Sequence, residues 1–224
     1  IGTMYLMTGF WSALVGTGFS FHIRLNLAQP GGIYSDMPQL YNAIITSHAL
    51  TMIFFFVMPT MMGGFGNWLI PLMLGCPDMM FPRLNNMSYW FLPGPMIMLL
   101  ASGLVEGGAG TGWTLYPPLS SSEFHSSPAV DLVVFSLHVA GMGSIMSSSN
   151  FMSSASGARF FNLLPERMPV FVWSMFVGSW LLLLSLPVLA GGLTMMITDR
   201  HINTCFFRPS GGGDPVLFQH LFWF

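Results

Sequence analysis

The chain has 224 residues, 53% of them apolar, and a mean hydropathy of +0.65. Only 6% are charged and none is lysine, whereas soluble domains carry about 25% charged residues. This composition excludes an ordinary soluble protein and a disordered chain, and the lack of a clustered Lys/Arg surface excludes a nucleic-acid binder. A polytopic membrane protein remains.

Long charge-free windows define the predicted elements. Because a bilayer-crossing helix needs roughly 20 mostly apolar residues, we predict five complete spans and the start of a sixth. The continuously apolar runs favour helices over barrel strands, which would alternate every second residue. The predicted fold is therefore an all-α, polytopic transmembrane bundle that forms one domain, residues 1–224. In chain order, the spans cover 3–24, 38–73, 86–106, 130–157 and 169–198, and the sixth begins at 215–224.

The second window is too long for one simple crossing, and its second half contains Pro59, Gly63 and Pro71. We expect one bent helix that continues toward Gly75. Two short helices are the less favoured alternative, because no polar loop separates them.

Alternating spans place three arginines on each membrane face, so the positive-inside rule does not orient the chain. Acidic residues are unevenly divided, but they contribute little to that rule. The two arginine groups are Arg83, Arg159 and Arg167 on one face, and Arg24, Arg200 and Arg208 on the other.

Three side chains in or beside the apolar windows indicate a cofactor or an interface. His48, in TSHALTMIFFFVMP, lies well inside a span and needs a partner there. It is either an axial ligand of a haem iron or a hydrogen-bonded helix contact. Arg24 is either an anchor at the membrane interface or a guanidinium at the polar edge of a cofactor. Trp113, in the glycine-rich GAGTGWTLYPPL, is either an interface aromatic or close to another group that the glycine backbone approaches.

A second group of polar residues suggests a route for protons. Asp78 and Asn85 lie in GCPDMMFPRLNNMSYW, with Asn67 before them, and Ser144 and Asn150 lie in the fourth span. A carboxylate at a membrane face followed by amides and hydroxyls is what a water-filled proton path needs. Asp78 is also consistent with a simple acid at a helix N-terminus, and the serine with a bond to a carbonyl one turn earlier.

Eight sequence blocks, in order along nearly the whole chain, resemble subunit I of the mitochondrial cytochrome c oxidases, which are haem–copper oxidases. The blocks are IGTMYLMTGFW, IRLNLAQPG, TSHALTMIFFFVMPTMMGGFGNWLIPLM, PDMMFPRLNNMSYWFLP, EGGAGTGWTLYPPL, DLVVFSLHVAG, LLLLSLPVLAGGLTMMITDR and GGGDPVLFQHLFWF. The resemblance adds family roles to the residues already selected.

For cofactors, the resemblance implies that His48 is one of the two axial ligands of the low-spin haem a iron. It implies that Arg24 hydrogen-bonds the formyl group of that haem and that Tyr41 lies close to it. Trp113 would contact a propionate of the high-spin haem a3, and Trp223 would lie beside the dinuclear centre of haem a3 and copper B.

For protons, the resemblance places the entrance of the D pathway at Asp78 and its polar lining at Asn67, Asn85, Ser144 and Asn150. The implied activity is electron transfer from cytochrome c to oxygen, coupled to proton pumping, in the mitochondrial inner membrane. A quinol oxidase of the same superfamily and a non-redox transporter are the alternatives. The implied partners are the rest of subunit I, oxidase subunits II and III with accessory subunits, cytochrome c and the lipid bilayer.

The sequence departs from the family in length. Family members have twelve spans, and this sequence stops before the stretch that carries the first copper ligand. We expect one half of a split subunit, inactive alone, which supplies haem a ligation and the D pathway but not the dinuclear copper ligands. A partial sequence of an intact subunit and a degenerate copy are the alternatives.

Overall fold

The computed structural model describes residues 1–160 and 163–223. Phe161, Asn162 and Phe224 belong to the predicted domain, and Phe224 to the predicted sixth span, but all three lie outside the described residues. Within those ranges, the fold is all-helical and has no β-strand, as expected. The elements are α1 (Gly2–Leu27), α2 (Pro38–Leu50), η1 (Thr51–Val57), η2 (Pro59–Gly66), α3 (Asn67–Leu74), α4 (Pro82–Trp90), α5 (Pro93–Ser102), α6 (Ala129–Gly157), η3 (Pro165–Arg167), α7 (Val170–His201), η4 (Pro209–Gly211) and α8 (Pro215–Phe222).

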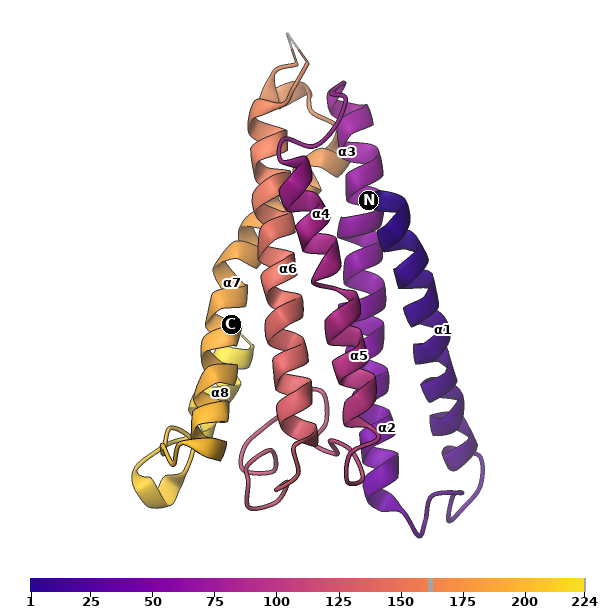
Figure 1. Ribbon diagram of the computed structural model, residues 1–224, viewed down its shortest axis with the longest axis vertical. Helices are drawn as coiled ribbons and strands as arrows, with labels where there is room; N and C mark the ends of the chain where they lie inside the picture. Colours follow the sequence, from indigo (N-terminus) through magenta and orange to yellow (C-terminus); the bar gives the residue numbers. More distant parts are fainter. Residues whose placement is uncertain (161–162, 224) are drawn as a thin grey trace.

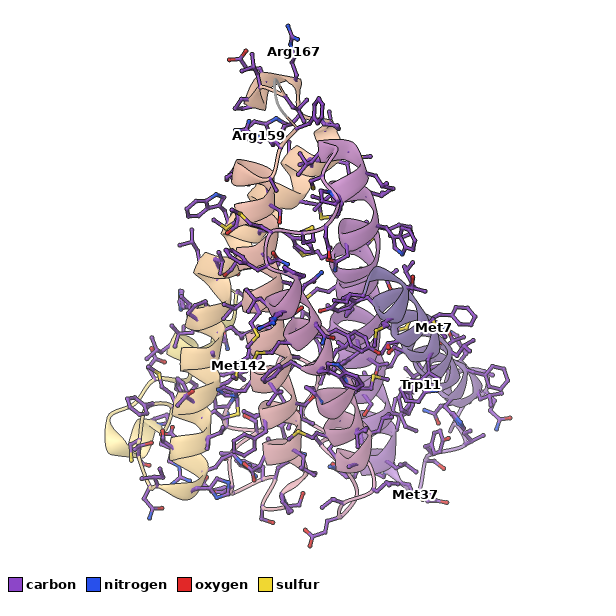
Figure 2. The ribbon with its side chains drawn as sticks, turned by 45° about the horizontal axis from the view of Figure 1, so that its top comes forward. Met7, Trp11, Met37, Met142, Arg159 and Arg167 are labelled. Carbon is purple, nitrogen blue, oxygen red and sulfur yellow. The ribbon has the colours of Figure 1, made fainter. Side chains whose placement is uncertain are left out.

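The helices run up and down along the long axis of the molecule, so the loops gather at its two ends (Figure 1). Figure 2 shows Arg159 and Arg167 at one end and Met37 at the other. The first end, called the 75–81 end, holds loop 75–81 and the segments 158–160 and 163–169. The opposite end, called the 103–128 end, holds loops 28–37, 103–128 and 202–214.

Charge is divided unevenly between these ends. Three arginines against two acids give the 75–81 end a net charge of +1, and three arginines against six acids give the 103–128 end −3. The middle of the bundle presents apolar side chains outward, such as Met7, Trp11 and Met142 (Figure 2). A surface of this kind, charged at two ends and apolar between them, fits a lipid bilayer.

Three helical segments are long and apolar enough to cross a membrane: Pro38–Leu74, Ala129–Gly157 and Val170–His201. α1 has 26 residues but is not among them, and its apolar run ends in the polar pair His22 and Arg24. The finding supports an integral membrane protein, whereas the count of five spans and a sixth stays a prediction.

The segment Pro38–Leu74 is one continuous helix, built from α2, η1, η2 and α3. Its middle has wider π-helical turns, in which the Met58 N–H donates to the Ile53 carbonyl five residues earlier. Pro59 has no N–H, and its ring would clash with the carbonyl four residues earlier in a regular α-helix. The wider turns accommodate this proline without ending the helix, so the alternative of two short helices does not describe this window.

The region of the predicted span 86–106 contains two helices rather than one. The structure begins this region earlier, at Pro82, and divides it into α4 and α5. Pro93 and Pro95 carry no N–H to continue the ladder of α4, and the Leu92 N–H instead makes a tight turn to the Tyr89 carbonyl at 2.9 Å. The two prolines therefore restart the helix as α5.

α8 is a helix of eight residues that lies beside α7 (Figure 1). The Asp214 carboxylate caps its first turn by accepting from the Val216 N–H at 2.9 Å, and Pro215 occupies the first helical position, where no N–H is needed. Asp214 followed by Pro215 is therefore the signal in the sequence for the beginning of a sixth helix.

Close packing of α1 against the long helix depends on two glycines. A Cβ on Gly16 would lie 2.4 Å from the Met52 sulfur, and one on Gly63 would lie 2.4 Å from the Tyr5 ring. Small residues of this kind let membrane helices approach closely. The contact brings α1 against both His48 and the polar residues described below.

Candidate functional site

His48 lies on α2, one turn before the π-helical segment, and is half-buried. Its Nδ1 is 2.8 Å from the Gly16 carbonyl of α1. Because a carbonyl only accepts, Nδ1 carries a proton, so a ring with a single proton has its lone pair on Nε2. In metal-binding histidines, the ring nitrogen that does not bind the metal usually donates such a hydrogen bond, and this bond orients the ring. The residues therefore fit a histidine that offers Nε2 to a metal.

Arg24 and Tyr41 were predicted beside the same cofactor. Arg24 is exposed in the last turn of α1, and within the described ranges its guanidinium makes no hydrogen bond or ion pair. Tyr41 stacks on Tyr34, with ring centroids 6.3 Å apart. The structure thus gives neither side chain a contact with His48, and their predicted roles stay predictions.

Trp113 and Trp223, both predicted near the second haem, are brought together although they are far apart in the sequence. Their rings meet edge to face with centroids 5.5 Å apart, and the Trp223 Nε1–H donates to the Tyr116 hydroxyl. Phe222 adds a second edge contact to Trp113 at 5.6 Å. Loop 103–128 and α8 are therefore joined by an aromatic cluster.

The segment that bears Trp113 is also fixed to the helix that bears His48. Thr46 is buried, and its hydroxyl donates to the Asn42 carbonyl at 2.8 Å and accepts from the Gly112 N–H at 3.0 Å. Gly112 directly precedes Trp113, and Thr46 stands two residues before His48.

Two of the predicted proton-path amides make direct contact. Asn85 Nδ2 donates to Asn67 Oδ1 at 2.7 Å, and Asn67 Nδ2 donates to the Gly63 carbonyl at 2.6 Å. Asp78 is exposed on the loop between α3 and α4, where its carboxylate accepts from the Met79 N–H at 2.7 Å. The acid therefore faces the medium, whereas Asn85 lies inside the bundle.

Three buried polar atoms near this region have no hydrogen-bond partner within the described residues: Asn85 Oδ1, Asn150 Nδ2 and Ser148 Oγ. Asn150 satisfies only its oxygen, which accepts from the Phe81 N–H at 3.0 Å. A buried polar group left unpaired costs about 1–3 kcal/mol, and buried groups of this kind are normally completed by ordered water. The cluster therefore has the donors and acceptors to hold water.

Tyr5 extends this polar region, and sequence reasoning missed it. Its hydroxyl lies 2.9 Å from Ser88 Oγ and 3.4 Å from Ser147 Oγ, and Ser88 Oγ donates to the Asn85 carbonyl at 2.7 Å. Tyr5, Ser88, Ser147 and Ser144 line a cavity of about 50 Å³, and its other lining residues are apolar side chains and glycines. Ser144 itself donates to the Ala140 carbonyl one turn earlier at 3.0 Å, which was the alternative expected for it. A tyrosine in the apolar first span was the available signal.

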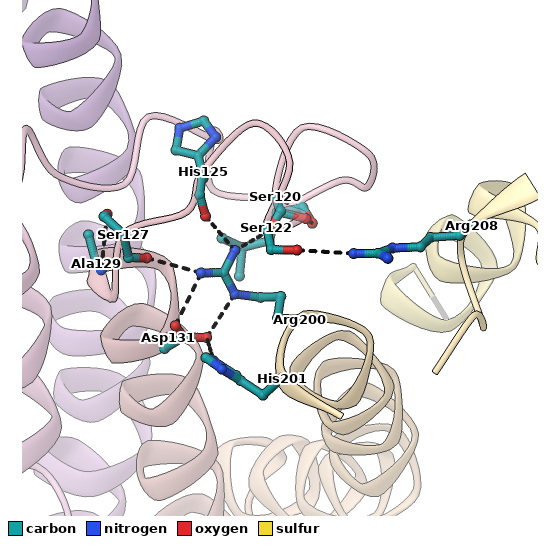
Figure 3. Close-up of polar contacts among 10 residues, drawn as sticks. Ser120, Ser122, His125, Ser127, Ala129, Asp131, Arg200, His201 and Arg208 are labelled. Carbon is teal, nitrogen blue, oxygen red and sulfur yellow. Dashed lines mark hydrogen bonds and ion pairs between the residues drawn. The ribbon is translucent and has the colours of Figure 1, made fainter. Parts of the chain in front are cut away.

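A buried ionic network at the 103–128 end was also missed (Figure 3). Arg200 in the last turn of α7 pairs with Asp131 in the first turn of α6 through two bonds of 2.8 and 3.1 Å. His201 Nε2 lies 2.9 Å from the same carboxylate. An acid and a base at adjacent ends of two successive spans were the signal in the sequence.

No group of three or more His, Cys, Asp or Glu side chains that could hold a metal ion occurs in the described part of the chain. His138, another histidine inside an apolar helix, has both ring nitrogens engaged, at 3.0 Å from the Val134 carbonyl and 3.1 Å from Thr194 Oγ1. Within the described ranges, His48 Nε2 makes no such bond, so it is the better candidate for a single metal ligand.

Comparison with known proteins agrees with the sequence blocks. A family model described as Cytochrome C and Quinol oxidase polypeptide I matches residues 1–224. Cytochrome c oxidase subunit 1 of Pecten maximus is 52% identical over 225 residues, which cover 100% of this chain and 47% of that protein. Cytochrome c oxidase subunit 1 of Mytilus edulis is 48% identical over 224 residues, which cover 100% of this chain and 41% of that protein. The chain thus spans about half the length of the curated relatives it matches.

Proposed function

Because this chain belongs to the family of cytochrome c and quinol oxidase polypeptide I, we propose that it forms part of the catalytic subunit of a proton-pumping oxidase. The family confirms the resemblance found in the sequence, and it implies haem and copper in the full protein. The two relatives are cytochrome c oxidase subunits, which favours cytochrome c over quinol as the electron donor. The overall reaction passes electrons from cytochrome c to oxygen and moves protons across the membrane.

The observation that carries the proposal is the hydrogen bond from His48 Nδ1 to the Gly16 carbonyl at 2.8 Å. It supports an imidazole that holds its proton on Nδ1 and offers Nε2 to the iron of a low-spin haem a. Such a haem, when bound, accepts and passes on one electron at a time. The protein's part is to fix the tautomer and the ring orientation, which a backbone carbonyl on a packed helix can do because it cannot rotate away.

The remaining cofactor contacts are proposed from the family positions. Arg24, which has five N–H groups and no protein partner within the described ranges, is suited to bind the formyl oxygen of haem a. Tyr41 would lie beside that haem. Trp113 would donate to a propionate of haem a3, and Trp223, in edge contact with Trp113, would border the haem a3–copper B centre, whose metal ligands the family places outside these residues.

We assign proton uptake to the 75–81 end. Asp78 is exposed there and can exchange protons with the medium. The Asn67–Asn85 pair and the unpaired Asn85 Oδ1 and Asn150 Nδ2 support a chain of ordered waters behind it. The cavity beside Tyr5 has Ser88, Ser144 and Ser147 on an otherwise mostly apolar wall. These hydroxyls would continue that chain into the bundle, because hydroxyls both donate and accept.

The surroundings follow from the same proposal. The chain lies in the mitochondrial inner membrane with the 75–81 end toward the matrix, among lipids and beside the rest of subunit I, subunits II and III and accessory subunits. The net negative 103–128 end then faces the compartment of cytochrome c, for which an acidic surface is favourable.

The test is the visible spectrum of the purified complex after His48→Ala. We expect the low-spin haem band to be lost, because the replacement removes an iron ligand. His138→Ala is the matched control, since it removes a histidine from another apolar helix whose two nitrogens are already bonded within the protein. An unchanged low-spin band in His48→Ala would refute the assignment, and a wild-type complex without any haem band would refute the oxidase function.

A further inference from the structure

Three backbone carbonyls of loop 103–128 converge on the guanidinium of Arg200 (Figure 3). Arg200 Nε and Nη2 donate to the two carboxylate oxygens of Asp131 at 2.8 and 3.1 Å. Its Nη1 donates to the carbonyls of Ser120 and His125 at 2.7 and 2.8 Å, and Nη2 donates to the Ser127 carbonyl at 3.0 Å. All five N–H groups are thus used, and three of them bind the loop backbone.

This arrangement requires arginine rather than any positive charge. The Arg200 side chain is 1% exposed, and a buried charge is tolerated only when it is paired and hydrogen-bonded. Lysine carries its three donors on one nitrogen atom, so it cannot bind both the Asp131 carboxylate and the three loop carbonyls as arginine does. Asp131 supplies the pairing charge, so the three carbonyl bonds remain available for positioning the loop.

The effect of Arg200 reaches the aromatic cluster through Ser120. The Ser120 hydroxyl donates to the Leu115 carbonyl at 2.8 Å, and its N–H donates to the Tyr116 carbonyl at 3.1 Å. Leu115 is fully buried with a φ of +53°, a left-handed conformation that is unfavourable for a residue with a Cβ. Contacts around it must impose such a backbone, and the bonds from Ser120 are part of them.

The segment 112–116 that these bonds hold is the one that carries the ring contacts with α8. Trp113 lies two residues before Leu115 and meets Trp223 at 5.5 Å. Tyr116 directly follows Leu115, and its hydroxyl accepts from Trp223. Arg200 is therefore two hydrogen-bonding steps from the backbone between these two aromatic residues.

We propose that Arg200, acting through Ser120, is a positioning residue that sets segment 112–116 against α8. By holding this segment, Arg200 also sets the position of Trp113 against the propionate of haem a3. This part of the proposal rests on the haem contact assigned to Trp113 above. This role depends on the planar arrangement of the five N–H donors of the guanidinium and not on its charge alone.

The experiment compares Arg200→Gln, Arg200→Lys and Ser120→Ala in the assembled, haem-loaded complex, using hydrogen–deuterium exchange of residues 112–120 and the visible spectrum. The matched control is Arg208→Gln, which removes the other arginine that contacts this loop, through one 3.0 Å bond to Ser122 Oγ. We expect exchange in 112–120 to become ~tenfold faster in both Arg200 variants, as local opening becomes easier. We also expect the high-spin haem band to shift while the low-spin band stays.

Ser120→Ala keeps the carbonyl that Arg200 binds but removes the hydroxyl bond to Leu115, so it should reproduce part of both effects. This variant decides the question if Arg200→Gln fails to assemble. Wild-type exchange in the Arg200 and Ser120 variants would overturn the proposal, as would full rescue by lysine or an equal effect of Arg208→Gln. Loss of protection in 112–120 with an unmoved haem band would uphold the positioning of the segment but overturn the link to haem a3.

Discussion

Gly16 offers the sharpest test of how α1 supports His48. In Gly16→Ala, the new Cβ would lie 2.4 Å from the sulfur and 2.9 Å from Cγ of Met52, whereas carbon atoms in contact are ~3.5–4.0 Å apart. Relieving such overpacking costs about 1–3 kcal/mol, partly offset by the ~0.5–1 kcal/mol that alanine gains over glycine in a helix. The overlap is relieved by a movement of the Met52 side chain or of α1, and a movement of α1 would lengthen the 2.8 Å bond from His48 Nδ1 to the Gly16 carbonyl.

A movement of roughly 0.7 Å is enough to take that bond beyond normal hydrogen-bond distance. Loss of a partner of this type lowers metal affinity by about 10–100-fold. We therefore expect less low-spin haem per purified complex and a changed midpoint potential of the haem that remains. The control is Gly18→Ala on the same helix, where a Cβ meets nothing within 4 Å. Equal haem content and potential in the two variants would refute the reasoning.

Two further predictions concern the 75–81 end. Asp78→Asn should slow turnover and proton pumping, whereas Glu166→Gln, which removes the other acid of this end, should not; normal pumping in Asp78→Asn would remove it from the pathway. Burial raises the pKa of the Cys76 thiol, a backbone hydrogen bond lowers it and the Asp78 carboxylate raises it, with a net upward shift. Less thiolate is then present at neutral pH, so alkylation of Cys76 should be slower than that of exposed Cys205 and should increase at higher pH, as mass spectrometry of labelled peptides would show; equal rates at pH 7 would contradict this.

The sequence was most informative where a polar residue stands within an apolar run. A histidine within an apolar run identified His48 without any knowledge of the fold, because a polar ring there needs a partner. The partner itself, the Gly16 carbonyl, could not be predicted, since every residue has a carbonyl and only the packing of α1 selects one. The division of span 86–106 was visible in Pro93 and Pro95, but the hydropathy of the window outweighed that signal.

Residues that act through long-range contacts were beyond the reach of pattern reasoning. Tyr5 looks like an ordinary apolar-span tyrosine until the fold places its hydroxyl beside Ser88, 83 residues away. Arg200 and Asp131 are 69 residues apart, and the sequence placed Arg200 only among the arginines of one membrane face. Their burial follows from loop 103–128, whose carbonyls converge on the guanidinium, and no local periodicity records such a loop.

The Thr46 hydroxyl has a consequence for motion. A single short side chain joins the helix that carries His48 to the backbone just before Trp113, with no flexible methylene chain between them to absorb a displacement. A sliding or rotation of α2 near His48 would either break this bond and leave the Gly112 N–H without its acceptor, or carry the tryptophan with it. The surroundings of the two proposed haem sites are therefore coupled through this bond. A displacement of the main chain at one site would displace the main chain at the other.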